Sequence, residues 1–368
     1  MRRSVQGARM ATMVAPNNTA VELALAPLDV RALARRAAVP AALALAAVGA
    51  VLLAQTRVHA VSDAINRGLD VSPGWAAVAV VFECASLVGY VALLSLVAGR
   101  AAPRVGVRES AQITLAGAAA TRVLPTAGAG GLALAFWALR QAGLRMQAAT
   151  RTLLAFLVVL YSVFLGSVLV AGSALAFGLV SNHGPVELGA IPAALAAVGI
   201  VSALALALAG KIRIEPDTGT DRASELAPHG SRIMVSARFV GDAVRDALRL
   251  IRSGDARLAG AVAYWAFDAA VLWAMLHAFG SPPALPVIVL AYFVGQVANT
   301  LPIPGSVSGG IAGVLIAFGL APALAVPAVL AYRTIAVWLP TPAAIAAVPA
   351  LRTTVARWRR ESGLLASR

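Results

Sequence analysis

Long apolar runs separated by short polar segments dominate the pattern of hydrophobic and polar positions along the chain. A helix needs about 20 apolar residues to cross the hydrocarbon core of a membrane. The stretches that meet this requirement are residues 38–56, 74–98, 151–180, 187–209, 257–279 and 323–350. The last one contains Pro327, Pro340 and Pro342, so we expect it to be broken near one end. The pattern predicts an all-α, polytopic membrane protein with six long transmembrane helices.

Two further apolar regions, residues 109–142 and 284–320, are interrupted by proline and glycine. The interrupting residues are Leu124, Pro125, Gly130 and Gly131 in the first region and Leu301, Pro302, Pro304, Gly305, Gly309 and Gly310 in the second. Each region could form a re-entrant hairpin of two short helices, although the arm 284–301 is long enough for a full span. The similar order of breaks suggests an internal repeat. Chance recurrence in a chain rich in alanine, glycine and proline is the alternative.

The positions of the basic residues predict the topology. Twenty-seven of the thirty Lys and Arg residues lie in segments 1–37, 99–151, 210–257 and 351–368. Cytoplasmic loops carry such an excess, so both termini are predicted to be cytoplasmic. Three full spans then separate the two interrupted regions, which would enter the membrane from opposite faces. Opposed broken helices of this kind form an inverted repeat and build midplane sites in many transporters.

The same topology divides the chain into a cytoplasmic N-terminal arm (1–37), a transmembrane domain (38–350) and a basic cytoplasmic tail (351–368). The polar insert 210–257 contains a predicted amphipathic helix from Ser231 to Arg252. Its predicted apolar face consists of Val240, Val244, Leu248 and Ile251. This helix could lie on the anionic inner leaflet or pack on the cytoplasmic ends of the spans.

Composition narrows the class of protein further. The chain is 60% hydrophobic and 12% charged, with a net charge of +14 and a mean hydropathy of +0.83. This hydropathy excludes a soluble nucleic-acid binder in spite of the basic charge. A bias to Ala, Arg, Gly and Val with a single Lys is typical of a GC-rich bacterial genome, so we expect the bacterial inner membrane.

No catalytic or metal-binding motif is found in the sequence. The one cysteine, Cys84, lies in an apolar run, and the four histidines lack ligand spacing. We therefore expect no metal, no cofactor, no catalytic residues and no enzymatic activity. Six aromatic residues are assigned to packing or to the membrane interface without a binding role: Tyr90, Trp137, Tyr264, Trp265, Trp273 and Trp338.

Ionisable residues inside spans are costly and are therefore functional candidates. Glu83, Asp268 and Arg333 lie within spans, and Arg122 precedes the first Leu-Pro break. The arginines could hold a lipid phosphate, since a guanidinium binds phosphate oxygens in pairs. The alternative is a set of structural salt bridges between helices.

Gln296 and Asn299 lie three residues apart, on one helical face that leads to the second break. They could hydrogen-bond a lipid headgroup. They could instead satisfy backbone groups that Pro302 and Pro304 leave without partners.

The C-terminal motifs resemble those of a known family. They are Pro302-Ile-Pro304-Gly305, then Tyr332-Arg333, then Trp338-Leu-Pro340. They are similar to the flippase-like transmembrane region of lysylphosphatidylglycerol synthases, in a form without the aminoacyl-transferase domain. The sequence departs from the family pattern at Ser306, Ser308 and Ile311, the last of which stands where the family commonly has Glu.

The resemblance implies a multi-span helical fold that handles phospholipid or polyprenyl-linked substrates. We expect a lipid translocase whose partners are membrane phospholipids and not nucleic acid. One alternative is an accessory subunit for a glycosyltransferase or lipid-modifying enzyme. The other is an intramembrane enzyme that uses Glu83 and Asp268 as acid and base.

Overall fold

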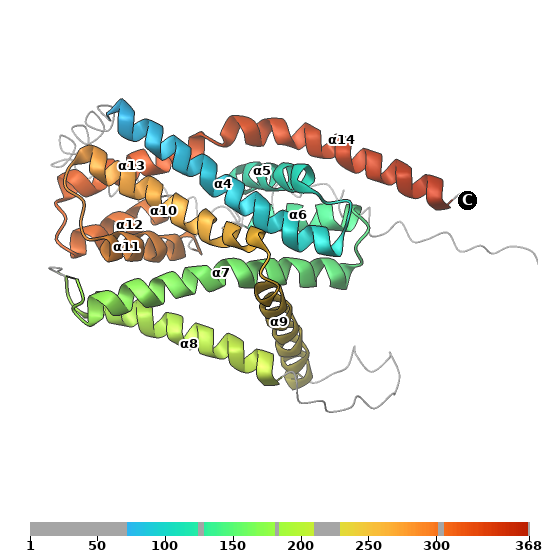
Figure 1. Cartoon of the computed structure of the whole chain (residues 1–368), viewed down its shortest axis with the longest axis horizontal. Helices are drawn as coiled ribbons and strands as arrows, with labels where there is room; N and C mark the ends of the chain where they lie inside the picture. The colour runs from blue at the N-terminus through green and yellow to red at the C-terminus, as the bar shows by residue number, and fades with distance from the viewer. Residues whose placement is uncertain (1–71, 124–128, 181–183, 210–228, 301–304, 367–368) are drawn as a thin grey trace, which may run out of the picture. The chain divides into compact units, whose positions relative to one another are not determined.

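The fold is given by a computed structural model that describes residues 72–123, 129–180, 184–209, 229–300 and 305–366. All regular elements in these ranges are helices, which confirms the predicted all-α class. Four of the predicted spans form single helices: α4 (Pro73–Ala101), α7 (Met146–Ala176), α8 (Glu187–Ala209) and α10 (Ala259–Phe279) (Figure 1). The predicted span 38–56 lies outside the described residues.

The predicted span 323–350 is two helices, which changes the predicted count of six long spans. Helix α13 (Pro322–Trp338) ends just before Pro340, and α14 (Thr341–Ala366) begins just after it. Proline has no backbone N–H to continue the helical hydrogen bonds, and the carbonyl of Pro340 instead accepts from Ala344 at 2.8 Å. By length and apolar composition, five helical stretches of the described chain could cross a membrane, the fifth being Pro322–Glu361 with this break inside it.

Both interrupted regions form hairpins of short helices. The first consists of α5 (Val107–Val123) and α6 (Ala129–Gln141), and the second of α11 (Leu285–Val297), the 3-10 turn η3 (Ala298–Thr300) and α12 (Ser306–Ala317). In each hairpin the two helices pack against each other. At only 13 residues, α11 is too short to be the full span that the sequence left open.

The two hairpins enter from opposite ends of the helical bundle. The first connects the end of α4 to the start of α7, and the second connects the end of α10 to the start of α13. Because α4 ends where α10 begins, these connections lie at opposite ends of α10. The predicted opposed arrangement is therefore present in the structure.

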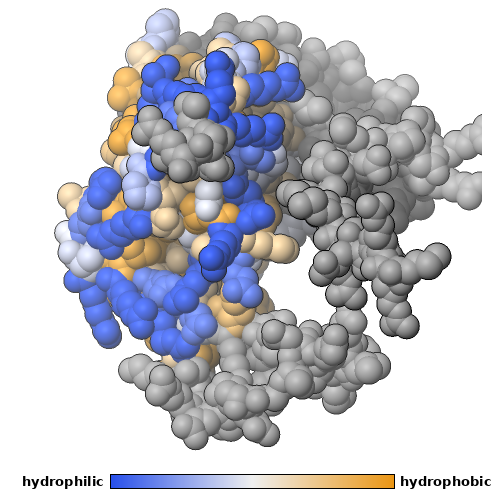
Figure 2. Space-filling view, turned by 90° about the vertical axis from the view of Figure 1, so that its right-hand side faces the viewer, coloured by the Kyte–Doolittle hydropathy of each residue, from blue (hydrophilic) through white to orange (hydrophobic). Residues whose placement is uncertain are grey.

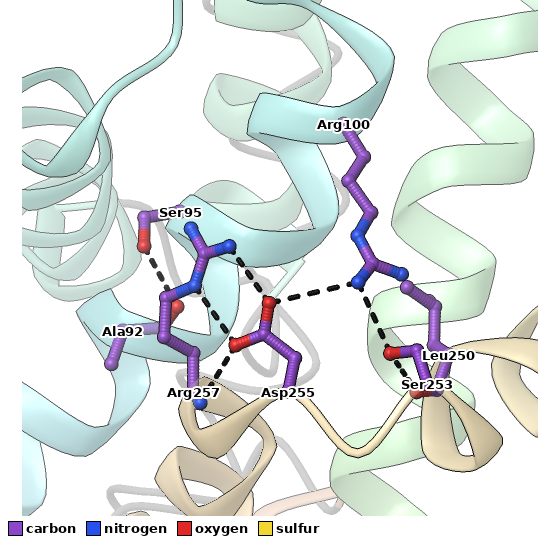
Figure 3. Close-up of polar contacts among 7 residues, drawn as sticks. All are labelled: Ala92, Ser95, Arg100, Leu250, Ser253, Asp255 and Arg257. Atoms are coloured by element: carbon purple, nitrogen blue, oxygen red, sulfur yellow. Dashed lines mark hydrogen bonds and ion pairs between the residues drawn. The ribbon is translucent and has the colours of Figure 1, made fainter.

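We call the end where α4 stops and α7 and α10 start the basic end. Figure 3 shows Arg100 donating to Ser253 Oγ at 3.1 Å and lying 3.6 Å from Asp255. Asp255 also accepts from the Arg257 guanidinium, which lowers the pKa of the carboxyl from 3.8 to about 2. Figure 2, which looks at the molecule from the side on which α4 ends, shows many hydrophilic side chains gathered there.

Helices α4 and α10 cross at two glycines. A Cβ at Gly260 would lie 2.3 Å from the carbonyl oxygen of Gly89, which is closer than real Cβ contacts allow. Such small-residue crossings let transmembrane helices approach closely. The crossing fixes the two helices that supply the intramembrane carboxylates.

Helix α9 (His229–Arg252) confirms the predicted helix in the polar insert and packs on α7 and α8. Arg245 donates to the carbonyl oxygen of Ala207 at 2.8 Å, at the end of α8. This is the packed alternative of the two that the sequence left open. Within the predicted apolar face Val244 is buried while Val240 and Ile251 are exposed, and the small residues Ala243 and Ala247 are buried as well. Small side chains bring α9 closer to its neighbours than valine or isoleucine could.

Helix α14 lies along α5 and includes residues that the sequence assigned to the basic tail. Thr354 Oγ1 donates to Gln112 Oε1 at 2.9 Å, and Trp358 is buried. Arg357 and Glu109 form an ion pair at 3.3 Å. The C-terminal segment is therefore a helix that packs on the bundle as far as Trp358.

Candidate functional site

A polar cavity of about 510 Å³ lies between the two hairpins and the long helices. Its walls come from α4, α5, α6, α7, α10, η3, α11 and α13, so both hairpins contribute. The polar side chains that line it are Glu83, Ser86, Tyr90, Thr114, Thr121, Tyr264, Asp268, Gln296, Asn299, Tyr332 and Arg333. A polar cavity within apolar helices is expensive to build, which marks it as the candidate site.

Five of the six predicted headgroup residues line this one cavity. They come from four separate parts of the chain: Glu83, Asp268, Gln296, Asn299 and Arg333. The sixth, Arg122, lies in the last turn of α5 beside the cavity-lining Thr121, and its side chain is outside the described residues.

The predicted motif residues form the turns and ends of helices around the cavity. Gly131, Tyr332 and Pro340 line it directly. Gly305 precedes α12 with φ of 82°, a conformation that glycine adopts without strain. Gly130 lies in α6, Gly309 and Gly310 lie in α12, and Trp338 is the last residue of α13. The other motif residues lie outside the described residues: Leu124, Pro125, Pro302 and Pro304.

Asp268 is held in place by tyrosines. Tyr292 Oη donates to Asp268 Oδ2 at 2.5 Å, and Tyr332 also interacts with the same carboxylate. The other carboxylate oxygen, Oδ1, is buried and has no hydrogen-bond partner among the described residues. An acceptor without a protein donor on the wall of a cavity is available to a donor group of a ligand.

Gln296 takes part in the same cluster. Its Nε2 donates to Tyr332 Oη at 3.2 Å, so it orients the tyrosine that adjoins Arg333. Neither predicted role of Gln296 includes this contact. Asn299 lines the cavity and is exposed.

Arg333 is half-buried in the cavity wall. It interacts electrostatically with Asp268 but takes part in none of the ion pairs and hydrogen bonds found in the described part of the chain. Arg333 and Asp268 therefore do not form a direct salt bridge, and their interaction acts over a longer distance. A guanidinium among apolar helices needs hydrogen-bond acceptors for its five N–H donors, and the described residues supply none to Arg333.

Two tyrosines that the sequence assigned to packing belong to the cavity. Tyr90 and Tyr264 both line it, and Ser86 connects their helices by donating to the carbonyl oxygen of Tyr264 at 2.9 Å. Helical spacing could have indicated Tyr264 and Tyr292, which lie four residues before Asp268 and Gln296 on the same helical faces. Trp265 does pack in the core, where its indole N–H donates to Leu160.

Ile311, which replaces the family's usual Glu, lies away from the cavity. It is a fully buried residue of α12 that packs so closely on Gly295 of α11 that a Cβ added there would overlap its Cγ1. The isoleucine tightens the second hairpin. The carboxylates of the cavity are those of Glu83 and Asp268.

The apolar spans, the opposed hairpins and the cavity lined by polar side chains define a multi-pass membrane protein. The family model of the lysylphosphatidylglycerol synthase TM region matches residues 35–344, and the chain belongs to this family. No curated protein matches the chain. The family assignment agrees with the resemblance found in the sequence motifs.

Proposed function

We propose that the protein is a lipid translocase, which moves an anionic phospholipid or polyprenyl-linked lipid through the polar cavity without covalent chemistry. The observation that carries this proposal is Arg333, a half-buried guanidinium with no direct protein acceptor in the described residues. A guanidinium stays charged at any physiological pH and binds two phosphate oxygens at once. A lipid phosphate is the acceptor that the surrounding bilayer can supply.

The other cavity residues support binding that is strong enough to select a headgroup but weak enough to release it. Asp268 lies close to Arg333 without a direct ion pair, so it reduces the positive field that an anion meets. Its free oxygen can accept from a hydroxyl or amine of the headgroup. The acyl chains would remain in the bilayer while the headgroup crosses between the hairpins.

The experiment measures translocation of fluorescent phosphatidylglycerol in vesicles that contain the purified protein. Arg333→Ala is expected to slow translocation about tenfold or more, because it removes a charged, paired hydrogen bond. Arg333→Lys keeps the positive charge but lacks the planar guanidinium, so its translocation rate should lie between those of the wild type and Arg333→Ala. Arg360→Ala, at an exposed position of α14, is the matched control and should behave as wild type.

Normal membrane insertion and abundance of Arg333→Ala are required for the comparison. Translocation that is equally fast in Arg333→Ala and in the wild type would overturn the proposal.

A further inference from the structure

A second hollow, of about 350 Å³, lies at the basic end between α4, α7 and α9. It shares no lining residue with the polar cavity. Its lining residues are Val97, Arg100, Ala101, Ala148, Arg151, Thr152, Ala155, Asp246, Arg249 and Leu250. The hollow is therefore separate from the proposed translocation site.

Three arginines and one carboxylate line this hollow. Arg151 binds Asp246 through two nitrogens, one of them Nη2 at 2.9 Å, and Arg249 contacts Asp246 at 3.1 Å. Arg100 is 3.6 Å from Asp255, but Arg257 binds both oxygens of that carboxylate more closely. The lining of the hollow keeps an excess of positive charge, and each guanidinium keeps donors that no group of the described residues uses.

The floor of the hollow is apolar. Val97, Ala155 and Leu250 line it and are buried, whereas the side chains of Arg100, Arg151 and Arg249 are 44%, 45% and 72% exposed. A free inorganic anion is best held by a cradle of polar N–H groups. A rim of guanidinium groups above an apolar floor instead matches a lipid, whose phosphate meets the rim and whose glycerol and first methylenes cover the floor.

We infer that this hollow binds the phosphate of an anionic phospholipid from the leaflet that faces the basic end. The lipid would bridge α4, α7 and α9, since each helix supplies one arginine. Helix α9 would then be held on the bundle by the lipid as well as by Arg151 and Arg245. This inference concerns binding alone and does not depend on the proposed translocation.

The experiment titrates short-chain phosphatidylglycerol into delipidated full-length protein and counts bound lipids by native mass spectrometry. All proteins carry Arg333→Ala, so that the polar cavity contributes equally to every measurement. Arg249→Gln is expected to weaken one binding event about fivefold, and the pair Arg100→Gln with Arg249→Gln about twentyfold. Arg252→Gln, one turn further along α9 and outside the hollow, is the matched control and should change the affinity less than about twofold.

Phosphatidylcholine and inorganic phosphate test the identity of the ligand. Phosphatidylglycerol should bind more tightly than either of them. Equal loss in Arg249→Gln and Arg252→Gln would indicate diffuse surface charge and overturn the inference. Inorganic phosphate that binds as tightly as phosphatidylglycerol would overturn the assignment to a lipid.

Discussion

A carboxylate inside an apolar bundle needs donors, and Asp268 obtains one from Tyr292 on a different helix. Tyr332, the residue next to Arg333, also interacts with Asp268 and accepts a hydrogen bond from Gln296. The cluster orders the acid and the base at a fixed separation without joining them. Such positioning keeps both groups available to a ligand.

Tyr292→Phe is expected to destabilise the protein, because it leaves a buried carboxylate oxygen without its donor. The cost of such a loss is about 1–3 kcal/mol. Thermal unfolding of the purified protein in detergent measures it as a lower Tm. Tyr161→Phe, at a half-exposed tyrosine of α7, serves as the control and should leave Tm unchanged. A Tm of Tyr292→Phe equal to that of the control would show that the hydrogen bond adds nothing.

At this scale the sequence predicted the charged and amide residues but not their tyrosine partners. Glu83, Asp268 and Arg333 stand out because a charge in an apolar run is rare. A tyrosine in such a run is common, and its role depends on the helix opposite. That Tyr292 meets Asp268 follows from the packing of α10 against α11, which hydropathy does not encode.

Among the helices, the α4–α10 pair matters most for the cavity, since it carries Glu83 and Asp268. The crossing at Gly89 and Gly260 sets the distance between the two helices. Any side chain there meets backbone atoms, which cannot move aside without shifting a whole helix.

Gly260→Ala is therefore expected to destabilise the protein by about 1–3 kcal/mol, the usual cost of overpacking. Gly166→Ala is the matched control, because a Cβ at Gly166 of α7 meets nothing within 4 Å. Alanine there should be neutral or stabilising by about 0.5–1 kcal/mol, since it favours the helix. Thermal unfolding of the two variants should give Tm shifts of opposite sign or clearly different size. A smaller loss in Gly260→Ala than in Gly166→Ala would contradict the close crossing.

The predicted elements were most accurate where length and apolar character alone decide the outcome. The spans at α4, α7, α8 and α10 follow directly from hydropathy. The break at Pro340 and the buried face of α9 depend on local hydrogen bonding and on small residues in contact. Side-chain size, which hydropathy ignores, determines which face of α9 is buried.

Charge governs the orientation of the whole molecule. The connection 280–283 has no Lys or Arg, whereas the basic end carries Arg100, Arg151 and Arg257. The positive-inside rule then predicts that the basic end is cytoplasmic.

Single cysteines at the two ends of α10 test this orientation in a Cys84→Ser background. Ser281→Cys is expected to react with a membrane-impermeant maleimide in intact cells. Ser253→Cys should react only after the membrane is made permeable. Both serines are exposed, so burial does not bias the comparison. The reverse labelling pattern would show that the basic end faces outward.

The central claim is that the polar cavity admits an anionic headgroup, and photo-cross-linking tests it most directly. A photoreactive amino acid is placed at Val337, which lines the cavity, or at the exposed Ile345, which does not line it, as control. The account predicts that Val337 cross-links phosphatidylglycerol in preference to phosphatidylcholine and loses this preference with Arg333→Ala, while Ile345 shows none. An absence of lipid adducts at Val337, with normal adducts at Ile345, would contradict the account.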